Sequence, residues 1–114
     1  MFYQQTEYGI LKKVLLCKPE HLQIIQPINV IQEKHAKQKI DTKKACQEHE
    51  RFVQTLVQEG VEVVFSNNHE RFPYQVNTRD LGVTTPKGII FGRFYSPYRW
   101  GEHRLTERTF LENE

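Results

Sequence analysis

Apolar residues occur along this chain in short runs separated by polar stretches, and the spacing within each run predicts an element. Two apolar clusters flank a pair of lysines from Ile10 to Cys17, which is typical of a strand that is buried except at its start. Pro19 ends this strand because it cannot donate to a sheet. Residues 20–31 are irregular. Residues 32–41 permit a helix but have almost no apolar face, so we expect a solvated lead-in or a loop there.

A long helix is the clearest prediction. Six residues recur at helical spacing and form one stripe: Ala45, His49, Phe52, Val53, Leu56 and Val57. Asp41 is a good N-cap for this helix, and Gly60 suits the position just after its end. Residues 61–65, "VEVVF", then predict a strand. The order strand, helix, strand predicts a βαβ unit whose two strands are parallel.

The second part of the chain predicts a hairpin followed by a helix. Leu81–Thr85 and Ile89–Phe94 are apolar runs, and the turn Pro86–Gly88 between them favours an antiparallel pair. Residues 105–114 begin a helical pattern with few apolar residues, namely Leu105, Phe110 and Leu111. A helix with so few anchors needs more chain or a partner to be stable.

Composition places the chain among soluble globular proteins. Its 114 residues suffice for one modest domain, and 38% hydrophobic with 26% charged residues is neither a disordered nor a membrane balance. Aromatic residues alternate with arginine in "GRFYSPYRW", a pattern that stacks on bases in some proteins. The net charge of +2 is too weak to support nucleic-acid binding. The N-terminus has no signal-peptide pattern and no apolar run reaches bilayer length, so we expect no membrane association and a cytoplasmic location.

The cysteines and histidines of the chain do not form a metal-binding pattern. Cys17 and Cys46 are too few for a disulfide framework or a zinc site and are most simply small core residues. His49 lies on the apolar helix stripe, where a packed residue is expected. The remaining histidines show no ligand spacing and have no accompanying nucleophile: His21, His35, His69 and His103. We therefore expect no metal in this chain.

Four segments in this order resemble one known family: "EYGILKKVLLCKP", "KKACQEHERFVQTLVQEGVEVV", "NTRDLGVTTPKGIIFGRF" and "RWGEH". They are similar to the N-terminal part of the guanidino-group-modifying enzymes of the pentein superfamily, nearest to the dimethylarginine dimethylaminohydrolases and the bacterial amidinotransferase-like proteins. The resemblance covers about residues 7–111. It implies an α/β fold, namely a partial pentein α/β propeller. The single partial domain 1–114 would comprise one βαβ-containing module, about 8–70, and the start of a second, 71–114.

The resemblance also implies roles for particular residues. In this family a cysteine thiolate attacks the guanidinium carbon, a histidine acts as acid and base, and carboxylates pair with the guanidinium nitrogens. Asp80 resembles the aspartate that holds the substrate guanidinium. Arg79, which precedes it where relatives carry Arg or Glu, is also expected to bind the substrate. Arg99 resembles an arginine that contacts the substrate carboxylate. Glu102 resembles the glutamate of an "R-x-x-E" pattern, for which we expect a structural role.

Each role has a simpler structural alternative. From the residues alone, Asp80 is more simply a cap at a strand end or an ion-pair partner of Arg79, because short motifs match by chance. Arg99 is compatible with a surface loop, and Glu102 with a helix start that the N-terminal dipole favours. "PY" at Pro73 replaces the Pro-Asp of some relatives, which removes a second acidic contact and weighs against dimethylarginine as the substrate.

The family's catalytic histidine and cysteine lie in later modules, so we expect no catalytic residue in this chain. The family's hydrolases use no organic cofactor, and the expected ligand is an arginine-like small molecule bound by the complete enzyme. Three hypotheses follow, in order of preference. The chain is an inactive fragment of a guanidino-group-modifying hydrolase, one half of a split enzyme, or a non-catalytic interaction module. Because a propeller cut after about one module exposes sheet edges, we also expect self-association.

Overall fold

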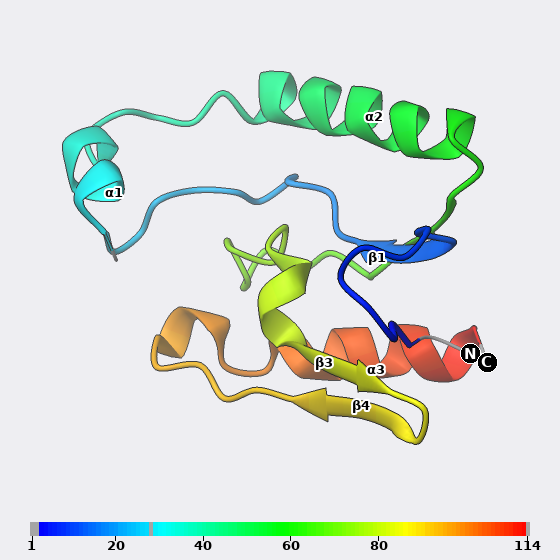
Figure 1. The fold of residues 1–114 in the computed structure, drawn as a ribbon. Helices are drawn as coiled ribbons and strands as arrows, with labels where there is room; N and C mark the ends of the chain where they lie inside the picture. The colour runs from blue at the N-terminus through cyan, green and yellow to red at the C-terminus, as the bar shows by residue number, and fades with distance from the viewer. Residues whose placement is uncertain (1–2, 28, 114) are drawn as a thin grey trace.

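The part of the chain that the structure describes forms two small sheets, three α-helices and two short 3-10 turns (Figure 1). The computed structural model describes residues 3–27 and 29–113. The elements follow in the order β1 (Lys13–Leu16), α1 (Val30–His35), α2 (Thr42–Gln58), β2 (Glu62–Phe65), the turn Thr78–Leu81, β3 (Gly82–Thr85), β4 (Gly88–Phe91), the turn Pro97–Arg99 and α3 (Glu102–Glu112). This is a mixed α/β fold.

The βαβ unit predicted from the sequence is confirmed. β1 and β2 are parallel, with a register that runs from the pair Lys13 and Glu62 to the pair Leu16 and Phe65. The side chains of the first pair also form a 2.9 Å ion pair. α2 begins at its expected cap, because Asp41 Oδ1 accepts a hydrogen bond from the backbone N–H of Lys44 at 3.0 Å.

The predicted hairpin is confirmed with shorter strands. β3 and β4 are antiparallel, and Thr85 pairs with Gly88 across a turn that leaves Pro86 and Lys87 between them. Leu81 was expected in the first strand but ends the preceding 3-10 turn instead, where it is 2% exposed. β3 begins at Gly82, where only glycine fits, because a Cβ would clash with the backbone oxygen of Ile90.

Helix α1 (Val30–His35) corrects the expectation of a lead-in or loop for the first four of residues 32–41, whereas residues 36–41 form no helix. It begins at Val30 because Asn29 caps it, with Asn29 Oδ1 accepting from Gln32 N at 2.8 Å. None of its described side chains is buried. The capping asparagine, rather than an apolar face, is the local signal for this helix, and hydrophobic periodicity does not detect such a signal.

Helix α3 begins three residues earlier than its apolar pattern predicts and buries a different face. Its buried side chains are polar, namely Glu102, Thr106 and Thr109, whereas Leu111 is 69% exposed. Leu105 and Phe110 are half-buried, so the expectation of apolar anchors is wrong only for Leu111. Among the described residues, Thr106 Oγ1 is a buried side-chain atom without a hydrogen-bond partner.

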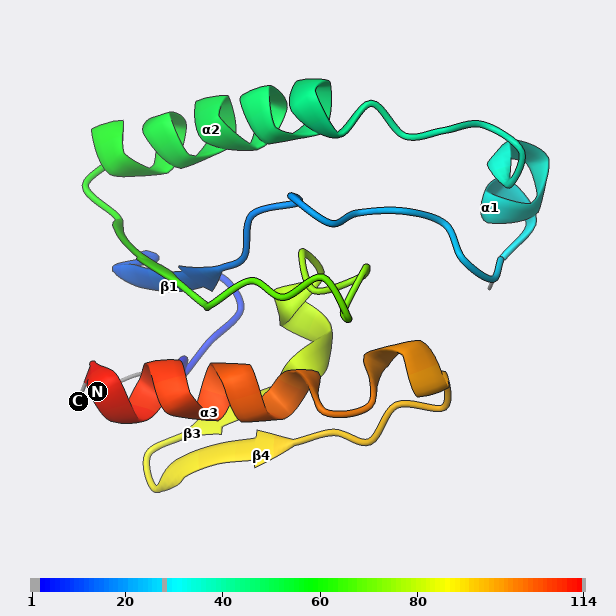
Figure 2. The ribbon, with the colours of Figure 1, turned by 180° about the vertical axis from the view of Figure 1, so that it is seen from behind.

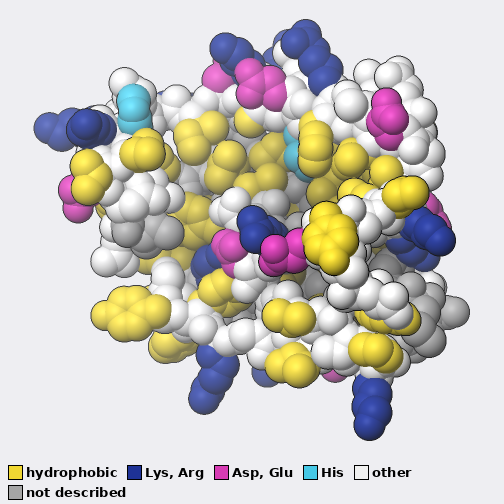
Figure 3. Space-filling model, viewed as in Figure 1, with side chains coloured by type: hydrophobic (Ala, Val, Ile, Leu, Met, Phe, Trp, Pro, Cys, Tyr) yellow, Lys and Arg dark blue, Asp and Glu magenta, His cyan; other side chains and the backbone are white. Residues whose placement is uncertain are grey.

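The elements lie in layers around a small core. In Figures 1 and 2, α2 lies on one side of β1, and α3 lies on the other side next to the β3–β4 hairpin. The buried apolar side chains are few: Leu16, Cys17, Val53, Val61, Phe72, Tyr74 and Leu81. Hydrophobic side chains also gather on the surface below α2 (Figure 3). Phe52 of α2 is 51% exposed. Within the described ranges, no helix combines the length and the apolar character that a bilayer span requires.

Candidate functional site

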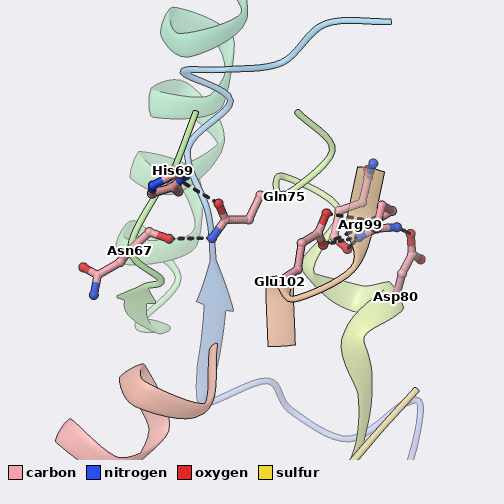
Figure 4. A network of polar contacts seen from close by, with 7 residues as sticks. Asn67, His69, Gln75, Asp80, Arg99 and Glu102 are labelled. Atoms are coloured by element: carbon pink, nitrogen blue, oxygen red, sulfur yellow. Dashed lines mark hydrogen bonds and ion pairs between the residues drawn. The ribbon is translucent and has the colours of Figure 1, made fainter. Parts of the chain in front are cut away.

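A buried arginine and a buried glutamate form the centre of the site. Arg99 ends the 3-10 turn before α3 and is 8% exposed, and Glu102 opens α3 and is fully buried. Arg99 Nε donates to both carboxylate oxygens of Glu102 at 3.0 and 3.2 Å, and Arg99 Nη2 donates to Glu102 Oε2 at 2.9 Å (Figure 4). The three-residue spacing across the start of the helix places the two side chains face to face.

The other edge of the same guanidinium contacts the turn before β3. Arg99 Nη1 donates to Asp80 Oδ2 at 2.7 Å, and Nη2 donates to the backbone oxygen of Asn77 at 3.1 Å. The ring of Phe94 lies against the guanidinium, with its centroid 4.0 Å from the central carbon. We call Asn77, Asp80, Phe94, Arg99 and Glu102 the Arg99 cluster.

Two local features hold the cluster in place. The turn that carries Asp80 is attached to the first sheet, because Thr78 Oγ1 donates to the backbone oxygen of Leu15 at 3.1 Å. At the other side, Gly101 has φ +98°, and a Cβ there would lie 3.3 Å from the ring of Phe72. A glycine at this position therefore allows the chain to reverse between Arg99 and α3.

The cluster contains one cation and two carboxylates, in unequal surroundings. Burial raises the pKa of Glu102, and the hydrogen bonds from Arg99 limit that rise. Burial opposes the charge of Arg99, but hydrogen bonds to Glu102 and Asp80 outweigh it and raise the pKa of the guanidinium. The Asp80 side chain is 52% exposed. Within the described chain its Oδ2 is bonded to Arg99, while no partner contacts its Oδ1. The cluster thus has one carboxylate oxygen available to a cationic ligand.

The structure brings together two of the three residues predicted from the sequence. Asp80 and Arg99 are in contact, whereas Arg79 is exposed and lies outside the cluster. The alternative that Asp80 pairs with Arg79 is wrong, because its ion-pair partner is Arg99. The alternative that Arg99 is a surface residue is wrong because it is buried. Glu102 opens α3, as its helix-start alternative predicts, and its structural role stays a prediction. The substrate roles of Asp80, Arg79 and Arg99 remain predictions.

Sequence reasoning missed two members of the cluster. The contact of Asn77 is through its backbone oxygen, for which the sequence has no signal. Phe94 was assigned to a strand, but it lies beyond β4 and stacks on Arg99. An aromatic residue five positions before an arginine is too common a pattern to predict such a contact.

A second polar network orders the loop between β2 and the cluster. Gln75 is 2% exposed; its Oε1 accepts from His69 N at 3.2 Å, and its Nε2 donates to the backbone oxygen of Asn67 (Figure 4). Because the buried Gln75 amide is hydrogen-bonded to the loop backbone, it holds the loop in one path. No group of three or more His, Cys, Asp or Glu residues is placed to hold a metal ion in the described part of the chain.

The buried thiol near the cluster is poorly suited to nucleophilic attack. Cys17 is fully buried, and burial, together with the charges of Glu102 and Glu20, raises its pKa to about 12. A thiol acts as a nucleophile only as the thiolate, so Cys17 is inert near neutral pH. The other cysteine, Cys46, is half-buried on α2.

In fold and sequence the chain matches the N-terminal part of the guanidino-group-modifying enzymes of the pentein superfamily. The N-terminal domain of ArgZ, an arginine dihydrolase of cyanobacteria that was crystallised covalently bound to a reaction intermediate, is 25% identical in sequence with a TM-score of 0.75. The match covers 89% of this chain and 36% of ArgZ's domain. A dimethylarginine dimethylaminohydrolase shares the fold at 23% identity and a TM-score of 0.70, over 91% of this chain and 38% of that one.

Sequence comparison places the chain more narrowly. Residues 18–113 match the sequence model of the eukaryotic N,N dimethylarginine dimethylhydrolases, and the chain belongs to that family. The uncharacterized protein YkgA of Bacillus subtilis (strain 168) is 38% identical over 106 residues, which are 93% of this chain and 37% of YkgA. The chain therefore spans less than two-fifths of the length of these relatives.

Proposed function

We propose that this chain supplies the guanidinium-binding part of an amidinohydrolase that acts on an arginine-like substrate. One observation carries the proposal. Asp80 Oδ2 accepts a hydrogen bond from Arg99 Nη1 at 2.7 Å, while Oδ1 of the same half-exposed side chain is available to a ligand. The guanidinium of Arg99 thus orients the Asp80 carboxylate so that it can also accept a hydrogen bond from the guanidinium of a substrate. Charge-assisted hydrogen bonds of this kind give both affinity and geometric specificity.

The proposed roles divide between three residues. Asp80 accepts hydrogen bonds from the substrate guanidinium, and Arg99 keeps the Asp80 carboxylate oriented. Arg79 is exposed and adjacent to Asp80 in the sequence, and we propose that it, rather than Arg99, binds the carboxylate of an arginine-like substrate. Most N–H groups of Arg99 are already hydrogen-bonded within the chain. That ligand class is supported by relatives crystallised with L-arginine and with ornithine.

The nucleophile and the general base of this proposed reaction come from residues outside the chain. Cys17 is buried and stays protonated, and Cys46 lies on α2, in the layer opposite α3 (Figure 1). We therefore expect the isolated chain to be inactive. In this proposal the chain forms one module of an α/β propeller and the start of a second, and the modules that carry the catalytic pair complete the site.

The proposal is tested in a complete enzyme that carries this N-terminal region. Asp80→Asn should lower kcat/KM by at least about tenfold to a hundredfold, because each lost charge-assisted bond is worth about 1.5–3 kcal/mol and 1.36 kcal/mol is about tenfold in rate. Asp41→Asn is the matched control, since asparagine caps a helix as well as aspartate does. Normal kcat/KM in Asp80→Asn would contradict the substrate role, whatever its melting temperature.

A second candidate function is half of a split enzyme. It is favoured by the two-stranded sheets and by the exposed apolar residues Phe52 and Ile90, which are surfaces that another polypeptide can cover. Mixing the chain with a polypeptide that carries the remaining part of YkgA should then produce citrulline release from L-arginine. A complex without citrulline release would support the third alternative, a non-catalytic interaction module.

A further inference from the structure

A cavity of about 460 Å³ lies between the loop after β2 and the start of α3, and Asp80 and Glu102 are not among its lining residues. The side chains that characterise it are His69, Arg71, Phe72, Trp100, His103 and Arg104. Two of these are arginines, two are histidines and none is a carboxylate. The volume is within the range of small-molecule sites.

The two arginines of this cavity lack the compensation that Arg99 has. Among the described residues, neither Arg71 nor Arg104 forms an ion pair, whereas Arg99 pairs with two carboxylates. The guanidinium of Arg71 lies over the ring of Phe72, at 5.8 Å from its centroid. Two uncompensated guanidinium groups around one hollow produce a positive potential there, which attracts an anion.

Hydrogen bonds orient two of the side chains that line the cavity, His69 and Trp100. His69 Nδ1 accepts a hydrogen bond from the backbone N–H of Arg71 at 3.1 Å. A neutral imidazole that accepts at Nδ1 carries its proton at Nε2, so this nitrogen of His69 is a donor. The Trp100 indole N–H donates to the backbone oxygen of Phe94 at 2.8 Å, which fixes a ring that is 58% exposed.

The geometry points to an anion-binding site in this cavity, for a phosphate or carboxylate group on a small molecule whose flat or apolar part lies against Trp100. Arg71 and Arg104 supply the charge, and both can bind an oxyanion through two parallel N–H groups. The Nε2 proton of His69 adds a directed donor. This site is separate from the guanidinium-binding role of Asp80, since the two use different side chains and opposite ligand charge.

The single tryptophan of the chain makes the test direct, because fluorescence excited beyond the absorption of the tyrosines reports on Trp100 alone. The chain is titrated with sodium phosphate and, separately, with sodium acetate, each at an ionic strength held constant with sodium chloride. We expect a saturable fluorescence change with at least one of the two anions. Arg104→Gln should weaken that binding at least about fivefold, because a charge-assisted contact is lost.

Arg108→Gln is the matched control, one turn further along α3, exposed and not part of the cavity lining. It should bind the anion as tightly as the unmodified chain. A response to phosphate, acetate or both identifies the group that the site accepts. The absence of a saturable response to either anion, or equal weakening by Arg104→Gln and Arg108→Gln in variants with unchanged circular dichroism, overturns the proposal.

Discussion

Replacing Arg99 by methionine tests the energetics of the cluster most directly. The substitution keeps a long side chain against Phe94 but leaves the carboxylate of Glu102, which is fully buried, without a cation. Removing one partner of a buried ion pair costs about 3–5 kcal/mol, because the remaining charge has lost its water and its partner. For a chain of this size, a loss of about 3 kcal/mol lowers Tm by roughly 12 °C.

The pH dependence of this loss has a defined sign. Burial already raises the pKa of Glu102 in the folded protein, and without Arg99 it should rise further. A carboxyl group whose folded pKa is above its unfolded pKa favours folding below the unfolded value, and this contribution is lost as pH rises through the folded value. The penalty of Arg99→Met should therefore be larger at pH 7.5 than at pH 5, where part of Glu102 is protonated.

The assay is urea unfolding followed by circular dichroism at both pH values, with linear extrapolation to water. Two variants serve as references. Asp80→Asn removes the other partner of Arg99, but that side chain is 52% exposed, so its loss should cost no more than about 1 kcal/mol. Arg99→Met combined with Glu102→Gln removes both charges and should recover much of the stability. A penalty that is the same at both pH values, or a double variant as unstable as Arg99→Met, would refute this reasoning.

Three further predictions concern cysteine reactivity, backbone strain and association. Iodoacetamide should modify Cys46 of the folded chain and modify Cys17 only on unfolding, because the Cys17 pKa of about 12 leaves almost no thiolate. Mass spectrometry that finds both cysteines labelled equally below the unfolding transition would contradict this prediction. Gly101→Ala should destabilise the folded chain more than Gly60→Ala. Both glycines have positive φ, but only at Gly101 would a Cβ lie close to another side chain, 3.3 Å from Phe72. Equal unfolding midpoints for the two variants would contradict this prediction. Light scattering should show concentration-dependent self-association, driven by exposed apolar side chains, and a monodisperse monomer at high concentration counts against it.

Local signals explain which elements could be predicted from the sequence. α2 has a capping aspartate, an apolar stripe and a final glycine, and the turn around Pro86 sets the hairpin, so these features agree with the structure without knowledge of tertiary contacts. The buried face of α3 could not be predicted in this way. Glu102 is buried because Arg99 neutralises it, and two threonines share its face, so hydrophobic periodicity selects the wrong residues.

The candidate site depended on contacts between distant parts of the chain. Asp80 and Arg99 lie nineteen positions apart and on different elements, and no helical or strand period connects them. Resemblance to a family selected both residues, but it did not reveal that they contact each other. Arg79 was selected by its position beside Asp80, and alternation along an irregular turn does not determine which of two neighbours faces the cluster.

The pairing of β1 with β2 has a consequence for the order in which the chain folds. β1 meets β2 across the intervening residues 17–61, whereas the hairpin joins Thr85 to Gly88 across a two-residue turn. The entropy of loop closure makes the longer connection costlier by about 2–3 kcal/mol. The hairpin and α2 can therefore form early, and the parallel sheet assembles last. Because opening of the parallel sheet releases β1 and β2 together, the inter-strand amides of the two strands should exchange with solvent at similar rates.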